Sequence, residues 1–203
     1  MASRRKIQDA MEHQLEMWRT SREAAADPGL RDVYPDIPRL PIRLICPRLD
    51  KEINYGNLLR IAEAFRLELV VFAPDDRPWD PSGAMGAVVW QPFERRTGFE
   101  AIAQAHADGY RVYGLDLHET ARSLHKIEWK FPAALVVGEE LHGLGDEHRA
   151  ACDELVAIPL YGLMQSLNVA VATGICVQRM VETLAAQDPR WRPVRAASRR
   201  LLD

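Results

Sequence analysis

Short apolar runs alternate with segments of helical period from about residue 40 to residue 186. Nearly continuous apolar runs are typical of strands that are buried on both faces of a sheet. The predicted strands are IRLIC (42–46), LELVVFA (67–73), VVW (88–90), YRVYGLD (110–116), AALVVG (133–138) and LVAIPL (155–160). The alternation therefore predicts an α/β domain with a parallel sheet and helices on both faces.

Helical period marks the segments between these strands. It predicts helices over 54–65, 99–109 and 146–152, and a long helix from about Ser166 to Ala186. The long helix starts with turns that are apolar on almost every side, so we expect it to be buried all round. Gln165 or Ser166 is placed to cap its first turn. Asn168 would then be a buried amide, which is either satisfied within the core or part of a site.

Two terminal segments flank the predicted domain. Residues 1–38 predict a helix and a proline-rich linker, residues 39–186 the domain, and residues 187–203 a basic tail. Within 189–203 one acid stands against five arginines, which are Arg190, Arg192, Arg195, Arg199 and Arg200. Such a cluster fits the phosphate backbone of a nucleic acid, although a solvated helix end accounts for the same charges.

Composition excludes several classes of protein. With 47% apolar and 27% charged residues the chain is typical of a globular protein, and we find no apolar run near the roughly 18 residues of a membrane span. The charged N-terminus is unlike a secretory signal, so we expect a cytoplasmic protein with no membrane partner. Cys46, Cys152 and Cys176 lie far apart in apolar stretches, which predicts reduced core thiols and no metal site.

Candidate chemistry lies in the loops after the predicted strands, because ligands of parallel sheets usually bind at the carboxyl ends. The first such loop has only Gly56 and lacks the glycine pattern of a dinucleotide site. The helix after it carries Asn54, Asn57 and Arg60. Arg60 beside free backbone N–H groups would form an anion site suited to a phosphate. A helix cap at Asn54 with a surface arginine explains the same residues.

A second loop, within LVVGEELHGLGDE (135–147), delivers Glu139, Glu140 and His142 to the sheet edge. Its glycines, Gly138 and Gly143, allow backbone to approach a ligand closely. Neighbouring carboxylates can act in acid–base chemistry, but two acids ahead of a helix also complement its N-terminal dipole. His142 is most simply a loop histidine.

Three stretches, NYGNLLRIAEAF, LVVGEELHGLGDE and IPLYGLMQSLNVAVA, resemble in this order the three motifs of the SpoU/TrmH-type RNA 2'-O-ribose methyltransferases of the SPOUT superfamily. The third match is the strongest, and the likeness covers nearly all of residues 40–184. The resemblance implies an α/β fold with a deep C-terminal trefoil knot, S-adenosyl-L-methionine as cofactor, and a homodimer. Connection rules alone favour an unknotted sheet, so the knot is an expectation from the family.

The resemblance also implies roles for individual residues. The expected cofactor-binding residues are Leu135, Val137, Gly138, Gly143, Ile158, Leu160, Ser166, Leu167 and Asn168. Those expected around the methyl group and the target ribose are Asn54, Arg60, Glu140, Ser166 and Asn168. Because a guanidinium stays protonated, we expect Arg60 to hold an RNA phosphate and to stabilise developing charge, with Glu140 as a proton acceptor.

Departures from the family pattern leave alternatives open. Glu139 stands where many members have Asn or a small residue, and Leu141 replaces a frequent glycine. A carboxylate near RNA phosphate is unfavourable unless it is paired or points away. A catalytically weak or inactive RNA-binding module is therefore one alternative, and a base methyltransferase of the same fold is another. The layout of short helical extensions around the domain resembles tRNA ribose methyltransferases. We therefore expect tRNA before rRNA as substrate, with salt-sensitive RNA binding by the tail.

Overall fold

The computed structural model describes residues 38–49, 51–73, 81–139 and 142–191. These residues form a seven-stranded sheet in the order β3-β2-β1-β6-β4-β7-β5, and every neighbouring pair is parallel. The strands are β1 (Leu40–Cys46), β2 (Leu67–Phe72), β3 (Phe93–Arg95), β4 (Arg111–Leu115), β5 (Arg122–Ser123), β6 (Ala133–Val137) and β7 (Glu154–Ala157). The parallel sheet confirms the main prediction from the sequence.

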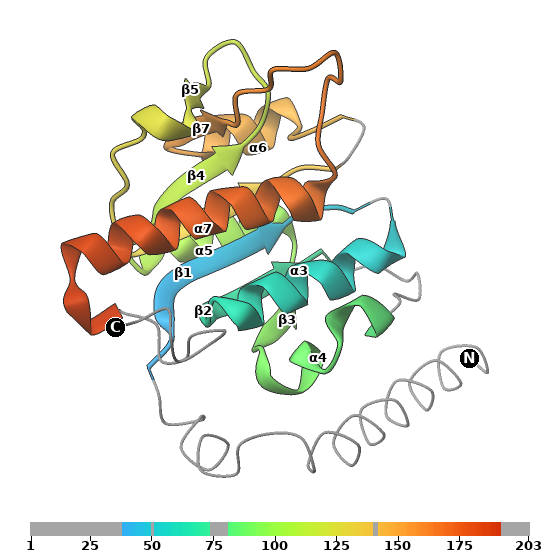
Figure 1. Cartoon of the computed structure of the whole chain (residues 1–203), viewed down its shortest axis with the longest axis vertical. Helices are drawn as coiled ribbons and strands as arrows, with labels where there is room; N and C mark the ends of the chain where they lie inside the picture. Colours follow the sequence, from blue (N-terminus) through green and yellow to red (C-terminus); the bar gives the residue numbers. More distant parts are fainter. Residues whose placement is uncertain (1–37, 50, 74–80, 140–141, 192–203) are drawn as a thin grey trace.

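Helices cover both faces of this sheet. They are α3 (Glu52–Ala64), α4 (Ala87–Trp90), α5 (Gly98–Ala107), α6 (Asp146–Ala151) and α7 (Val169–Gln187), with short 3₁₀ turns η2 (Pro81–Ala84), η3 (Leu124–Lys126) and η4 (Pro189–Trp191). Figure 1 shows α3 and α7 in front of the sheet and α5 behind it. The predicted arrangement of helices on two faces is therefore confirmed.

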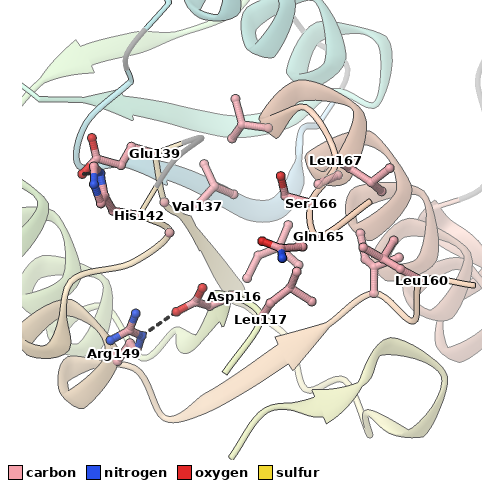
Figure 2. Close-up of a pocket in the computed structure, with 16 residues that line it drawn as sticks. Asp116, Leu117, Val137, Glu139, His142, Arg149, Leu160, Gln165, Ser166 and Leu167 are labelled. Carbon is pink, nitrogen blue, oxygen red and sulfur yellow. Dashed lines mark hydrogen bonds and ion pairs between the residues drawn. The ribbon is translucent and has the colours of Figure 1, made fainter. Parts of the chain in front are cut away.

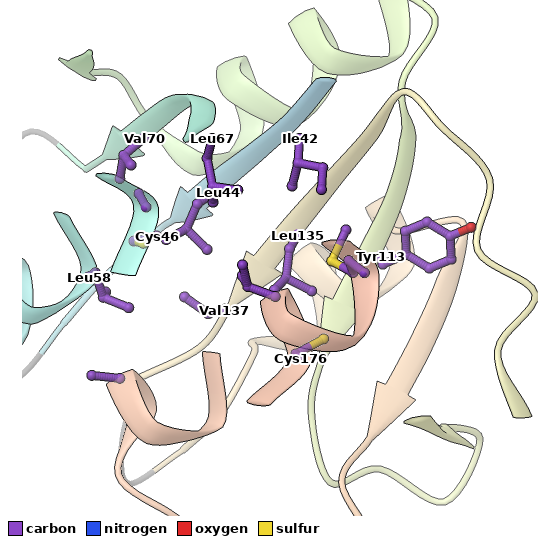
Figure 3. Packing of buried hydrophobic residues seen from close by; sticks show 14 of the residues in the cluster. Ile42, Leu44, Cys46, Leu58, Leu67, Val70, Tyr113, Leu135, Val137 and Cys176 are labelled. Carbon is purple, nitrogen blue, oxygen red and sulfur yellow. The ribbon is translucent and has the colours of Figure 1, made fainter. Parts of the chain in front are cut away.

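The alternation of side chains along β1 shows why its sequence is apolar at nearly every position. Ile42, Leu44 and Cys46 point into the core under α3 and α7 (Figure 3). Ile45 points the other way, into a second cluster that includes Ile102 of α5. Because successive side chains of a strand face opposite sides, a strand covered on both faces must be apolar at nearly every position.

All three cysteines are free. Cys46 and Cys176 are buried, and burial raises the pKa of both thiols. Cys152 is half-buried, and burial is the main cause that raises its pKa to about 12. None of the three is a reactive thiolate near neutral pH, so the prediction of structural thiols is confirmed.

The prediction of a strand at 88–90 is wrong. These residues belong to α4, which follows Gly86 in the left-handed region (φ 90°) and packs against α3. Three apolar residues in a row satisfy a strand or a helical turn equally well, so contact with α3 decides the structure. The sequence also failed to predict β3 and β5, which are very short and carry arginines.

The long helix begins later and is more exposed than predicted. Its N-cap is Asn168, whose side-chain oxygen accepts hydrogen bonds from the backbone N–H groups of the second and third helical residues. Gln165 and Ser166 lie before the helix, so the predicted cap at either residue is wrong. Val171 is 53% exposed and Ile175 is 41% exposed. One side of α7 is therefore uncovered in the single chain, contrary to the expectation of burial all round.

Within the described residues, α7 is also long and apolar enough, by length and composition, to cross a membrane. This corrects the expectation that no such segment exists. Cys176, Val177, Met180 and Leu184 of this helix are nevertheless buried in the core against the sheet, as is typical of a core helix. Other predictions fall on residues outside the described ranges, namely the helix predicted within residues 1–38, most of the linker that follows it, and most of the basic tail.

Candidate functional site

A cavity of about 310 Å³ lies beyond the carboxyl ends of β4, β6 and β7. Its walls are the end of β4 with the residues after it (115–117), the loop after β6, the segment from β7 into α7 (158–172), and Arg149 of α6. Figure 2 shows their side chains around a common space. The volume suits a small ligand, and the position matches the usual binding site of parallel sheets.

One wall of the cavity is formed by glycine backbone. A Cβ on Gly138 would lie 2.1 Å from the carbonyl carbon of Gly143, and a Cβ on Gly143 would lie 2.4 Å from Asp116 Oδ1. Gly143 also has a φ of 64°, in the left-handed region that favours glycine. These two positions therefore have no room for a side chain, because Gly138 packs against the backbone of Gly143 and Gly143 packs against Asp116.

Glu139 joins this wall and is held by several contacts. Its backbone exchanges two hydrogen bonds with Gly143, at 3.2 and 3.0 Å. Its carboxylate lies 3.5 Å from the Arg48 guanidinium and 3.6 Å from His142 Nδ1. The acid that departs from the family pattern is thus paired with Arg48, which meets the condition under which a carboxylate near an RNA phosphate is tolerated.

Asp116 and Arg149 form an ion pair in the cavity, and neither residue was singled out from the sequence. Arg149 Nε donates to Asp116 Oδ2 at 2.5 Å, and the same guanidinium pairs with Asp146. The hydrogen bond to Asp116 is the largest cause of the raised pKa of Arg149, so the guanidinium stays charged. The available signal was position, because Asp116 directly follows β4 at the carboxyl end of the sheet.

A hydrogen bond joins the first and third motifs. Asn168 Nδ2 donates to Asn54 Oδ1 at 3.3 Å, while Asn168 Oδ1 caps α7. Asn54 is buried inside α3, whose N-cap is Lys51, so the predicted cap at Asn54 is wrong. The buried amide therefore belongs to Asn54, and the exposed Asn168 donates one hydrogen bond to it.

The structure places most of the predicted cofactor-binding residues around one cavity. The members that line it are Val137, Gly138, Gly143, Ile158, Leu160, Ser166 and Leu167. Leu135 is fully buried within the sheet, and Asn168 caps α7. Neither of these two lines the cavity. Binding of a cofactor by these residues stays a prediction.

The predicted catalytic and RNA-binding residues are more scattered. Asn54 and Asn168 contact each other and Ser166 lines the cavity, whereas Arg60 is exposed on α3 and does not line it. Glu140 lies outside the described residues. Arg190 is exposed and pairs with Asp188 at 2.6 Å. The other arginines of the tail, Arg192, Arg195, Arg199 and Arg200, lie outside the described residues.

Fold and cavity together define a parallel α/β domain with a small-molecule site at the carboxyl ends of its strands. The model of the SpoU rRNA methylase family matches residues 41–178, and the chain belongs to this family. The matched region contains both asparagines of the Asn54–Asn168 contact and the whole lining of the cavity.

Two relatives with different named substrates illustrate the range of the family. The chain is 33% identical over 155 residues to the 23S rRNA (guanosine-2'-O-)-methyltransferase RlmB of Ralstonia nicotianae. The aligned region covers 73% of this chain and 61% of that protein. The chain is 29% identical over 141 residues to the tRNA (guanosine(18)-2'-O)-methyltransferase of Escherichia coli, covering 68% of this chain and 62% of that protein. The chain thus spans about three fifths of the length of either relative.

Solved structures show the same fold. An AdoMet-bound rRNA methyltransferase from Sinorhizobium meliloti superimposes with a TM-score of 0.66 at 27% identity, over 76% of this chain and 60% of that one. A TrmH/SpoU tRNA modifying enzyme from A. aeolicus gives a TM-score of 0.69 at 20% identity, over 79% and 84%. At 20% identity, the likeness to the A. aeolicus enzyme shows only that the two proteins share a fold.

Proposed function

We propose that this chain transfers a methyl group from S-adenosyl-L-methionine to a ribose 2'-hydroxyl of RNA, and that it acts as a homodimer. The observation that carries the proposal is that the second and third motifs form two walls of one cavity. Both relatives named above are RNA 2'-O-methyltransferases by name, and one similar structure is described as AdoMet-bound. A knotted backbone around the cavity is part of the same proposal.

The residues that line the cavity fit a nucleoside with a charged extension. Leu160 and Leu167 offer apolar surface to a purine ring, and Gly138 and Gly143 contribute backbone to the lining. Asp116, Ser166 and Glu139 supply polar groups along the same cavity. The proposed cofactor, when bound, supplies an electrophilic methyl group on a sulfonium that leaves without help from a metal. The main task of the chain is then positioning, which is worth up to about 7–11 kcal/mol.

The reactive hydroxyl must be presented next to this cavity. The Asn54–Asn168 hydrogen bond holds the start of α7 against α3, the helix that carries Arg60. Since Arg60 is exposed and outside the cavity of its own chain, its guanidinium is free to face a ligand that arrives from outside. We propose that it holds an RNA phosphate and stabilises developing negative charge, with Glu140 as proton acceptor.

Exposed apolar side chains support the proposed dimer. Tyr161, Leu163 and Met164, in the loop before α7, are 96%, 102% and 77% exposed, and Val171 and Ile175 on α7 are also exposed. Apolar groups gathered in neighbouring segments are rarely left in water by a soluble protein. A second copy of the chain that covers this loop and helix would remove them from water and lie beside the cavity.

Incubation with labelled S-adenosyl-L-methionine and separate tRNA and rRNA fractions, followed by nucleoside analysis, tests the activity. We expect a 2'-O-methyl nucleoside, with tRNA as the first fraction to be labelled. A base-methylated product would favour the base methyltransferase alternative. RNA binding without any heat on titration with the cofactor would favour the inactive RNA-binding module.

The Arg60→Ala variant tests the role of the arginine. We expect methylation to fall by about 10²–10³-fold while cofactor affinity is retained, because Arg60 does not line the cavity. Arg179→Ala on α7, whose guanidinium pairs only loosely with Glu182 at 4.0 Å, is the matched control. Full methylation by Arg60→Ala together with its loss in Glu140→Gln would show that the role given to Arg60 is wrong.

A further inference from the structure

We infer that Asp116 is a cofactor-recognition residue that accepts a hydrogen bond from a ribose hydroxyl of the adenosyl group, and that Arg149 positions it. This inference rests on the proposed function, since it assigns residues to the proposed cofactor cavity. Neither Asp116 nor Arg149 lies within the three motif stretches quoted in the sequence analysis. The side chain of Asp116 is buried, it pairs with Arg149, and one of its oxygens accepts no hydrogen bond from the described part of the chain.

Asp116 is fixed by both its backbone and its side chain. Its backbone N–H donates to the carbonyl of Val156 in β7 at 3.0 Å, which places it at the edge of the sheet. Its side chain is only 8% exposed, and Arg149 Nε lies 2.5 Å from Oδ2. A carboxylate so deeply buried needs a cation or hydrogen-bond donors that compensate for lost water.

The second oxygen of this carboxylate is left for a ligand. Oδ1 accepts no hydrogen bond from the described part of the chain, and it packs against Gly143, where a Cβ would lie 2.4 Å from it. An ionised carboxylate accepts at about four positions, so one donor from Arg149 leaves most of this capacity unused. Asp116, Gly143 and Arg149 all line the cavity. A ligand in the cavity is therefore the natural donor.

The distribution of polarity in the cavity favours a ribose at this point. In Figure 2, Glu139, His142 and Arg149 lie on one side and Leu160 and Leu167 on the other, with Asp116, Gln165 and Ser166 between them. An adenine ring on the apolar side would place the sugar next to Asp116. Acidic side chains commonly bind ribose hydroxyls in nucleotide sites at the carboxyl ends of parallel strands, since a carboxylate can only accept.

Arg149 serves as the positioning residue. Its Nε holds Asp116 while its Nη1 holds Asp146, so the guanidinium is anchored on both sides. Asp146 is 97% exposed and does not line the cavity. Asp146 therefore offers a matched control, because it is the same residue type, bound to the same guanidinium, outside the site.

Calorimetric titration with S-adenosylhomocysteine and with its 2'-deoxy and 3'-deoxy forms tests the inference. We expect Asp116→Asn to bind S-adenosylhomocysteine at least tenfold more weakly than wild type, and Asp146→Asn to bind within twofold of wild type. Removal of the recognised hydroxyl should weaken binding by wild type at least fivefold and by Asp116→Asn less than twofold. Arg149→Lys, which keeps the carboxylate and loses the fork, should show an intermediate loss. If Asp116→Asn fails to fold, wild type and Arg149→Lys are each titrated with S-adenosylhomocysteine and its deoxy forms, and their losses of affinity are compared.

Two results would overturn the inference. The first is a variant Asp116→Asn that discriminates ribose from deoxyribose as strongly as wild type. The second is 5'-methylthioadenosine, which lacks the amino-acid part, binding equally to wild type and Asp116→Asn, because Asp116 would then recognise the ammonium group. Either result leaves the proposed function intact as long as wild type binds S-adenosylhomocysteine. Failure of wild type to bind S-adenosylhomocysteine or S-adenosyl-L-methionine at all would remove the proposed function and the inference together.

Discussion

Two loops line the same cavity but are held in different ways. The loop after β6 is closed by two backbone hydrogen bonds between Glu139 and Gly143 and is tied to Arg48. In the loop before α7, no side chain of residues 159–167 makes a hydrogen bond or ion pair with the described part of the chain, and Leu163 and Met164 are exposed. Contacts within the chain thus hold the loop after β6 in shape. The loop before α7 instead has exposed apolar side chains that need another surface to cover them.

We expect the largest difference between the two loops when one methyl group is added to each of them. Gly138→Ala should destabilise the protein by about 3 kcal/mol and abolish cofactor binding, because its Cβ would meet the backbone of Gly143. Gly162→Ala is the matched control, since nothing lies within 4 Å of a Cβ there, and we expect a change within about 0.5 kcal/mol. Urea unfolding and calorimetry measure both. Equal effects of the two substitutions would show that the loops are held alike.

A charged residue in the loop before α7 tests whether a second copy of the chain covers this loop. Leu163→Asp should weaken the proposed dimer at least about tenfold, or ~1.4 kcal/mol, because the charge would be buried against the partner. Sedimentation equilibrium measures the dissociation constant. Phe99→Asp, on α5 at the other face of the sheet and 43% exposed, should leave association unchanged. Association that weakens only in Phe99→Asp would move the interface to that face.

Asn168 ends the loop before α7 and supplies its anchor. Asn168→Ala should cost about 1–2 kcal/mol of stability, because it loses the cap of α7 and the hydrogen bond to Asn54. Asn168→Asp keeps the capping oxygen and loses only the donor to Asn54, so it should cost less. Chemical denaturation separates the two contributions. A larger loss in Asn168→Asp than in Asn168→Ala would contradict this division.

The smallest effect concerns the ion pair of the loop after β6. Arg48 is 66% exposed and its Nε lies 3.5 Å from Glu139 Oε2, so Arg48→Ala should change stability by no more than about 0.5 kcal/mol. The change should shrink further in high salt, since exposed charges are screened. Thermal unfolding at low and high salt checks this. A loss above about 1 kcal/mol would mean that the pair, and not the backbone hydrogen bonds, holds the loop.

Much of the fold was predictable because most elements have a strong period. The continuous apolar runs of β1, β2, β4 and β6 are recognisable without any tertiary information. The segment at 88–90 was not, because a run of three apolar residues fits two conformations and only packing against α3 selects one. The start of α7 was misplaced for a related reason, since three of the four residues at 165–168 are polar and each can cap a helix, whereas only Gln165 and Ser166 were expected to do so.

The candidate site was predictable only in part. The motifs located two walls of the cavity, including Gly138 and Ser166, because the residue types in those stretches resemble a known family. Asp116 and Arg149 carry no such signal, and their sequence separation of 33 residues hides their contact. Arg60 is the opposite case. Its motif is clear in the sequence, but its side chain does not line the cavity of its own chain.

The order of most strands and helices, the parallel α/β class and the family motifs followed from the sequence alone, because these depend on local period and residue type. Which of these residues meet followed only from the packing of the folded chain. Asn54 and Asn168 are 114 positions apart and become partners because α3 and α7 lie on the same face of the sheet. The ion pair in the cavity and the uncovered side of α7 have the same origin, since contacts between distant residues depend on the path of the chain and not on any local pattern.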